Sequence, residues 1–95
     1  MQVDFHPEAT IDLNESAEWY AERSPGAARD FVVAVDVAIS SIVSDSHRFI
    51  YMDNRHQACS VIAFPFQIVY RKHDQGVVVV AVAHAKRRPR YWRWR

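Results

Sequence analysis

The segment FQIVYRKHDQGVVVVAVAHA, residues 66–85, decides the fold of this chain. Its two halves are rich in Val, Ile, Phe and Tyr, the residues that favour strands. Between them lies His73-Asp74-Gln75-Gly76, a hairpin turn in which we expect Gly76 to take a positive φ. Residues 77–80 are four consecutive valines, without the alternation of a half-exposed strand. The segment therefore predicts a β-hairpin of residues 66–72 and 77–85, whose second strand is central and covered on both faces.

A third strand-like run, residues 58–64, precedes this hairpin and is separated from it by Pro65. Three consecutive strands joined by tight turns predict an antiparallel meander. Upstream, residues 45–56 are polar and irregular, and we interpret them as a loop with room for one extended segment.

The first 44 residues predict a short strand followed by two helices. Val3 and Phe5 alternate with polar residues, and Pro7 then opens a helix that runs to about residue 23, with apolar positions three and four residues apart. We expect the acidic residues of this helix, Asp12 included, on its outer face. Ser24 is a candidate cap for a second helix of residues 25–43.

The second helix carries an apolar stripe at helical spacing. Val33 and Val37 lie off this stripe, either as scattered apolar residues or as a widening of the face toward a partner. The short interhelical loop predicts an antiparallel helical hairpin. The fold class is thus α+β, in the order β-α-α-β-β-β, with one domain over residues 1–95 and the helical hairpin packed on a small, mainly antiparallel sheet.

Charge is concentrated at the end of the chain. Residues 86–95, which we call the tail, hold six basic residues and no acidic one, whereas residues 1–85 hold six basic and eleven acidic residues. Such a patch attracts nucleic acid, phosphate or an acidic protein. We expect the site on the open face of the sheet, beside the tail. The candidate binding residues are Lys86, Arg87, Arg88, Arg90, Tyr91, Trp92 and Arg93.

Three interpretations of the tail remain open. Its alternating guanidinium and aromatic groups can stack on bases and contact phosphates. They can equally form the rim of a protein interface, where Arg, Trp and Tyr are enriched. In the third, Tyr91 and Trp92 pack against the helices and fix the chain end. The three are not exclusive, since Tyr91 and Trp92 can anchor the tail while Arg90, Arg93 and Arg95 face outward.

Several classes of protein are disfavoured. Cys59 is the only cysteine, so we expect a packed thiol, no intrachain disulfide and a reducing, cytoplasmic setting. We find no signal peptide, and the longest apolar stretch, residues 77–83, is too short to span a bilayer. The five histidines are scattered without ligand spacing, so neither a metal site nor a cofactor is expected.

Four stretches resemble a known family. They are Glu8-Ala9 with Asp12-Leu13, residues 19–28 (WYAERSPGAA), residues 64–66 (FPF) with 68–71 (IVYR), and residues 81–89 (AVAHAKRRP) followed by Tyr91-Trp92. In this order they resemble the RelE/ParE toxin superfamily of type II toxin–antitoxin systems, particularly its ParE-like branch. The resemblance implies a growth-inhibiting toxin that a cognate antitoxin wraps and neutralises. It also implies one of two targets, because RelE-like members cleave mRNA on the ribosome and ParE-like members inhibit DNA gyrase.

A nuclease would need groups for proton transfer and for stabilising the charged phosphorane. The candidates are Arg71, His84, Arg87 and Tyr91, of which the last two resemble the C-terminal catalytic residues of RelE-like enzymes. The predicted strand 58–64 lacks the basic residues that such enzymes commonly carry there. We therefore predict a ParE-like gyrase inhibitor. A ribosome-dependent mRNA endonuclease is the alternative, and an inactive antitoxin-binding homologue the third.

Overall fold

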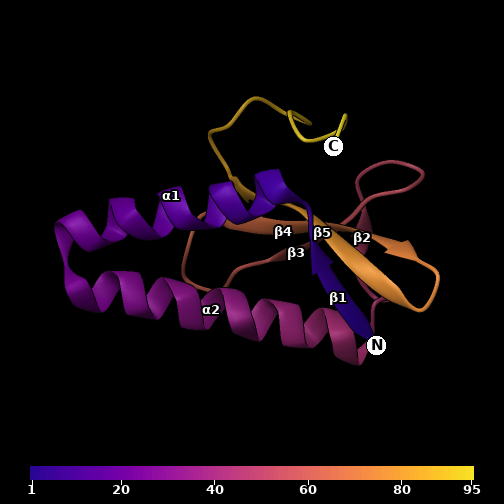
Figure 1. The fold of residues 1–95 in the computed structure, drawn as a ribbon, viewed down its shortest axis with the longest axis horizontal. Coiled ribbons are helices and arrows are strands. Elements are labelled where there is room, and N and C mark those ends of the chain that lie inside the picture. The colour runs from indigo at the N-terminus through magenta and orange to yellow at the C-terminus, as the bar shows by residue number, and fades with distance from the viewer.

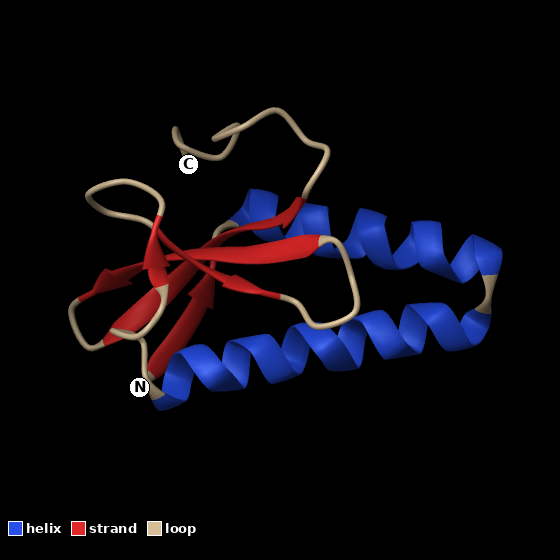
Figure 2. Ribbon diagram, turned by 180° about the vertical axis from the view of Figure 1, so that it is seen from behind, coloured by secondary structure: helices blue, strands red, loops and turns tan.

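The computed structural model describes residues 1–95 and places two helices against a five-stranded sheet (Figure 1). The sheet has the order β1-β5-β4-β3-β2, so β5 is an interior strand that lies between β1 and β4. Residues 85–95 follow β5 as a loop without helix or strand (Figure 2). The elements are β1 (Gln2–Phe5), α1 (Pro7–Arg23), α2 (Pro25–Ser44), β2 (Ile50–Tyr51), β3 (Gln57–Ser60), β4 (Phe66–His73) and β5 (Gly76–His84).

The β4–β5 hairpin forms as its sequence predicts, with antiparallel pairing from Phe66↔His84 to His73↔Gly76. The expected positive φ is at Asp74 (φ 44°) and not at Gly76, because Asp tolerates the left-handed conformation in turns. Gly76 is required for another reason. β1 runs parallel to β5 with Gln2 opposite Gly76, and a Cβ at Gly76 would overlap the main-chain oxygen of Gln2.

The meander of β3, β4 and β5 is confirmed, but β3 is shorter than expected. It ends at Ser60 instead of continuing to residue 64. Residues 61–65 instead turn the chain, with Ala63 at φ 71° and the Val61 N–H donating to the Phe66 carbonyl. The extended segment expected within residues 45–56 is β2, which pairs with β3 through Ile50↔Ala58.

The two helices begin where their prolines predict. The His6 ring accepts a hydrogen bond from the Glu8 N–H and caps α1 (3.0 Å). Ser24 occupies the cap position of α2, but its side chain makes no capping bond, so the expected role of its hydroxyl was wrong. The Ser24 main-chain oxygen instead accepts from the N–H of Ala27. Neither helix combines the length and the apolar character needed to cross a membrane.

The main core lies between the helices and one face of the sheet. On α2 the buried residues are Phe31, Val35, Ala38 and Ile42, at helical spacing. Phe31 lies 4.8 Å from Phe66, ring centroid to centroid. Val32 and Val43 belong to the predicted apolar stripe, but they point outward and are more than a third exposed, as are Val33 and Val37. The buried stripe is therefore narrower than the sequence pattern.

A second, smaller core covers the opposite face of the sheet. Its members from the strands are Ala58, Val69, Val80, Ala81 and Ala83, and Trp92 of the tail packs over them. Helices cover one face of β5 and the tail covers the other, which confirms the expectation drawn from the unbroken valine run.

Candidate functional site

The tail is an ordered loop held against the sheet. Just before the tail, the Ala85 N–H donates to the carbonyl of Pro65, in the turn that precedes β4 (2.8 Å). Further on, main-chain hydrogen bonds of i→i+3 spacing follow one another, from Tyr91 to Arg88, from Arg93 to Arg90 and from Arg95 to Trp92. Arg90 takes a positive φ (58°), which reverses the chain. The tail therefore has a defined path across the sheet.

Trp92 anchors this path. Its side chain is 3% exposed, whereas Trp94, two residues later, is 85% exposed. The Trp92 ring lies 4.8 Å from the His56 ring, centroid to centroid. Packing of Trp92 was one of the three open interpretations of the tail, but its partner is the open face of the sheet and not the helices. Trp92 is thus inaccessible to a partner, and Trp94 is accessible.

A buried carboxylate fixes the end of the tail. Asp12 was expected on the outer face of α1, but it is only 7% exposed and points toward β5. One carboxylate oxygen, Oδ2, accepts from the Val82 N–H (3.2 Å), the Tyr91 hydroxyl (3.0 Å) and Nη1 of Arg95 (2.7 Å). Arg95 also donates to the Val80 carbonyl (2.9 Å). The expectation that Arg95 faces outward was therefore wrong.

These contacts set the protonation of the buried groups. Burial raises the pKa of Tyr91, and the charge and hydrogen bond of Asp12 raise it further, to about 12. Burial lowers the pKa of Arg95, but the hydrogen bond and charge of Asp12 outweigh this and leave it raised. At neutral pH the Tyr91 phenol is protonated, and its hydroxyl donates to a carboxylate.

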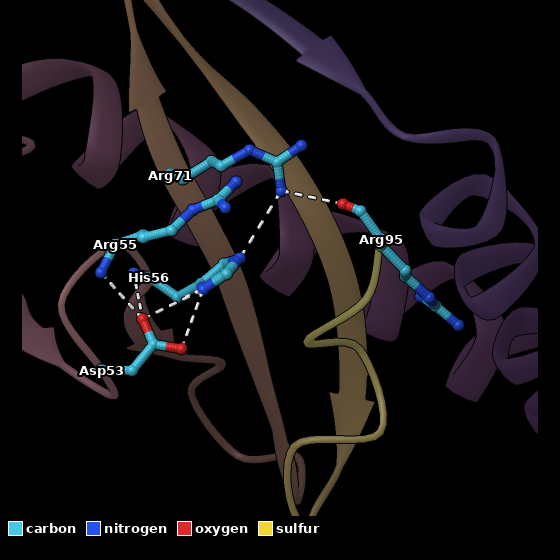
Figure 3. Close-up of polar contacts among 5 residues, drawn as sticks. All are labelled: Asp53, Arg55, His56, Arg71 and Arg95. Carbon is cyan, nitrogen blue, oxygen red and sulfur yellow. Dashed lines mark hydrogen bonds and ion pairs between the residues drawn. The ribbon is translucent and has the colours of Figure 1, made fainter.

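A second polar cluster holds the last residue of the tail (Figure 3). Asp53 accepts from the N–H groups of Arg55 (2.8 Å) and His56 (2.7 Å), and from the His56 ring (3.0 Å). Nη1 of Arg71 lies 3.5 Å from the other ring nitrogen of His56 and donates to the Arg95 main-chain oxygen (3.1 Å). Arg71 thereby links the middle of the sheet to the tail.

Electrostatics in this cluster follow from its geometry. Burial raises the pKa of Asp53, but the two N–H donors and the His56 ring outweigh it and lower the value to about 2. Burial lowers the pKa of Arg71, and the nearby charge of Arg55 lowers it further. The cluster therefore holds an ionised Asp53 carboxylate paired with the His56 ring.

A groove of about 680 Å³ lies between α1 and the start of the tail. Its rim carries the half-exposed Trp19 and the exposed Lys86 and Arg87. The Arg87 guanidinium stacks on the Tyr91 ring, 3.9 Å from its centroid. His84 accepts the Lys86 N–H on its ring nitrogen (2.9 Å). Other residues that line the groove include Asp12, Glu15, Tyr20, Pro65, Phe66 and Val82.

The four residues considered for catalysis are only partly brought together. His84 and Arg87 line the groove, and Arg87 contacts Tyr91. Arg71 instead belongs to the cluster with His56 at the end of the tail. Among the candidate binding residues, Tyr91 is half-buried and Trp92 is buried. The remaining candidates are exposed: Lys86, Arg87, Arg88, Arg90 and Arg93.

Sequence reasoning missed the residues that hold the tail, namely Asp12, Asp53, His56 and Arg95. One signal was available, because Asp12 is three residues after the buried Ala9 and so lies on the inner side of α1. Cys59 is the packed thiol that its flanks predicted; it is buried, and burial raises its pKa.

A family model and solved structures match this chain. The family model described as the ParE toxin of the type II toxin–antitoxin system, parDE, matches residues 3–89. Among solved structures, a chain of the chromosomal ParDE toxin–antitoxin system from P. aeruginosa aligns with a TM-score of 0.78. It is 12% identical, and the alignment covers 90% of this chain and 97% of that chain. This likeness confirms the α+β fold class. No curated protein matches the chain.

Proposed function

The chain belongs to the ParE toxin family of type II toxin–antitoxin systems, and from this membership we propose that it inhibits growth by binding DNA gyrase through its tail. It acts in the cytoplasm, where a cognate antitoxin neutralises it. The observation that carries this proposal is the defined path of the tail, which holds Trp92 on the sheet and leaves every tail cation except Arg95 exposed.

An ordered cationic loop suits a protein interface. Arg90, Arg93 and Trp94 are all exposed, and the Arg93 guanidinium lies over the Trp94 ring. Arg and Trp are enriched among residues that dominate interface energies. Because the tail is already held in one path, binding does not have to order it, and this lowers the entropic cost of association.

The same geometry favours protein binding over RNA cleavage. A general base should have a pKa near the operating pH. The pKa of Tyr91 is instead raised to about 12, and its hydroxyl keeps its proton and donates a hydrogen bond to Asp12. Arg71 is engaged by His56 and the end of the tail. The open sheet face, where a substrate would meet Arg71, is covered by Trp92.

The antitoxin has a surface of matching character in the groove and tail. The groove has an apolar floor that includes Tyr20 and Phe66, and its rim carries Lys86 and Arg87. An acidic segment with apolar side chains complements this surface, and by covering the tail it would exclude the target. Val33 and Val37 are half-exposed on α2 outside this groove, and Val37 lines a separate hollow with Ile50.

Two assays separate the candidate functions. Purified protein is added to gyrase supercoiling reactions and, separately, to translating ribosomes with mRNA cleavage mapped by primer extension. We expect inhibition of supercoiling and no cleavage. Ribosome-dependent cuts would overturn the proposal in favour of an mRNA endonuclease. Activity in neither assay, with antitoxin binding retained, would identify an inactive antitoxin-binding homologue.

Variants test the role of the tail. Replacing Arg90 and Arg93 by Ala should weaken gyrase inhibition about tenfold or more, because interface arginines commonly contribute over 1 kcal/mol each. The matched control is Arg29→Ala, which removes an exposed arginine from α2. A second pair, Arg87→Ala with Tyr91→Ala, tests the groove rim. Full toxicity of both soluble double variants would contradict the assignment.

A further inference from the structure

We propose that Asp12 is the positioning residue of the tail: its carboxylate fixes Tyr91 and Arg95 and thereby sets where the tail presents its exposed cations. This inference deepens the proposed function and rests on it only where gyrase inhibition is measured. Its other prediction, that Asp12 keeps the tail in place on the sheet, can be tested without any target.

Asp12 is suited to this role because one carboxylate joins three elements. It belongs to α1, it accepts the Val82 N–H of β5, and it accepts Tyr91 and Arg95 of the tail. Its side chain is 6% exposed and that of Arg95 is 12% exposed, so the ion pair is shielded from water. Hydrogen bonds to charged groups are stronger than neutral ones, and burial increases the difference.

The carboxylate acts on the exposed cations through the Tyr91 ring. Its hydrogen bond fixes the hydroxyl end of this ring, and Arg87 stacks on the ring face at 3.9 Å. The guanidinium of Arg95 lies 5.0 Å from the same ring. If Asp12 loses its charge, its hydrogen bonds to Tyr91 and Arg95 weaken. The ring on which Arg87 stacks is then held less firmly at the groove rim.

This arrangement divides the arginines of the tail into two kinds. Arg95 is a clamp, since its guanidinium is used by Asp12 and the Val80 carbonyl. Arg90 and Arg93 are exposed and remain available to a partner. The family match ends at residue 89, so the Arg95 half of the clamp lies beyond the matched range.

The first experiment measures tail order. In a Trp19→Phe, Trp94→Phe background, Trp92 is the only tryptophan, and acrylamide quenching of its fluorescence reports the exposure of the tail. Asp12→Asn can retain an oxygen at the Oδ2 position, but it removes the charge and places an amide nitrogen opposite Nη2 of Arg95. We expect the quenching constant of Trp92 to rise toward that of a reference variant in which the exposed Trp94 is the only tryptophan. The far-ultraviolet circular dichroism spectrum, which reports secondary structure, should not change. An unchanged quenching constant would overturn the proposal.

The second experiment is a double-mutant cycle with Asp12→Asn and Arg95→Gln, read by gyrase inhibition. Each single variant should lose about tenfold or more of its inhibition, and the double variant should lose little beyond the worse single variant. Additive losses would mean that the two residues act independently and would refute the clamp. Arg95→Gln changes no core residue. Its own loss of inhibition therefore tests the clamp even if Asp12→Asn folds poorly.

A stability control separates positioning from general destabilisation. Val35→Ala removes buried volume from α2, on the helical side of the sheet and away from the tail. At a temperature where both variants are fully folded, Val35→Ala should retain inhibition and Asp12→Asn should not. Equal losses would show that Asp12 contributes only stability. If the parent protein does not inhibit gyrase, the quenching result still decides the role of Asp12.

Discussion

Replacing Trp92 by Ala should detach the tail and remove a large part of the stability of the protein. Trp92 is the tail's main contribution to the second core, where it covers Val69 and Val80 on the face opposite the helices. No helix covers this face, so removal of the indole exposes buried strand residues to water.

The size of the effect follows from the buried area. An aromatic side chain buries about 150–250 Å², which at roughly 25 cal/mol per Å² corresponds to about 4–6 kcal/mol. Area estimates are upper limits, and Trp→Ala changes in cores typically cost about 3–5 kcal/mol. Because the tail can detach while the rest of the fold persists, we expect a loss in the free energy of unfolding at the low end of the second range, about 3 kcal/mol. A domain of this size has a total stability of roughly 5–14 kcal/mol.

Urea denaturation followed by circular dichroism measures this loss, with Trp94→Ala as the matched control. Trp94 is 85% exposed, so its removal should change the free energy of unfolding by no more than about 0.5 kcal/mol. The melting temperature of Trp92→Ala should fall by about 12 °C or more. If the two variants differed by less than about 1 kcal/mol, a value within the ordinary range for point substitutions, the burial of Trp92 on the sheet would be refuted.

Three further predictions concern the rest of the chain. Gly76→Ala should separate β1 from β5 and cost about 2 kcal/mol or more in urea denaturation, whereas Gly26→Ala, whose added Cβ meets only ordinary contact distances, should be neutral or slightly stabilising. The pKa of Asp53 is lowered from 3.8 to about 2, so its contribution of about 2 kcal/mol is present above pH 4 and disappears as the pH falls toward 2. Asp53→Asn should therefore have a lower free energy of unfolding than the parent at pH 7 but not near pH 2. The control Asp36→Asn, at an exposed position, should match the parent at every pH. If the free energy of unfolding of Asp53→Asn were lower than that of the parent by the same amount at every pH, this assignment would be contradicted. The Cys59 thiol should react with a disulfide reagent only on unfolding, because it is buried and burial raises its pKa; rapid reaction in the native state would contradict the packing of β3.

Local patterns predicted the elements of the fold well. The hairpin of β4 and β5 follows from strand-forming residues on either side of a turn, and both helices follow from apolar spacing between prolines. The errors occurred where one residue had two physical roles. Gly76 has the sequence context of a turn glycine, but its lack of a side chain serves the close approach of β1. Asp12 has the charge of a surface residue at a position on the inner side of α1.

The sequence by itself determined the elements, their order and the concentration of cations at the end of the chain, because each depends on residues close to one another along the chain. Only the tertiary structure decided what the tail does. Asp12 meets Arg95 across 83 positions, and Arg71 meets the same residue across 24. A buried carboxylate is stable only where the fold brings donors to it, and no local pattern specifies those donors. Packing of α1 and the tail around β5 therefore turned Arg95 into a clamp and left the other tail cations, Arg90 and Arg93 among them, exposed.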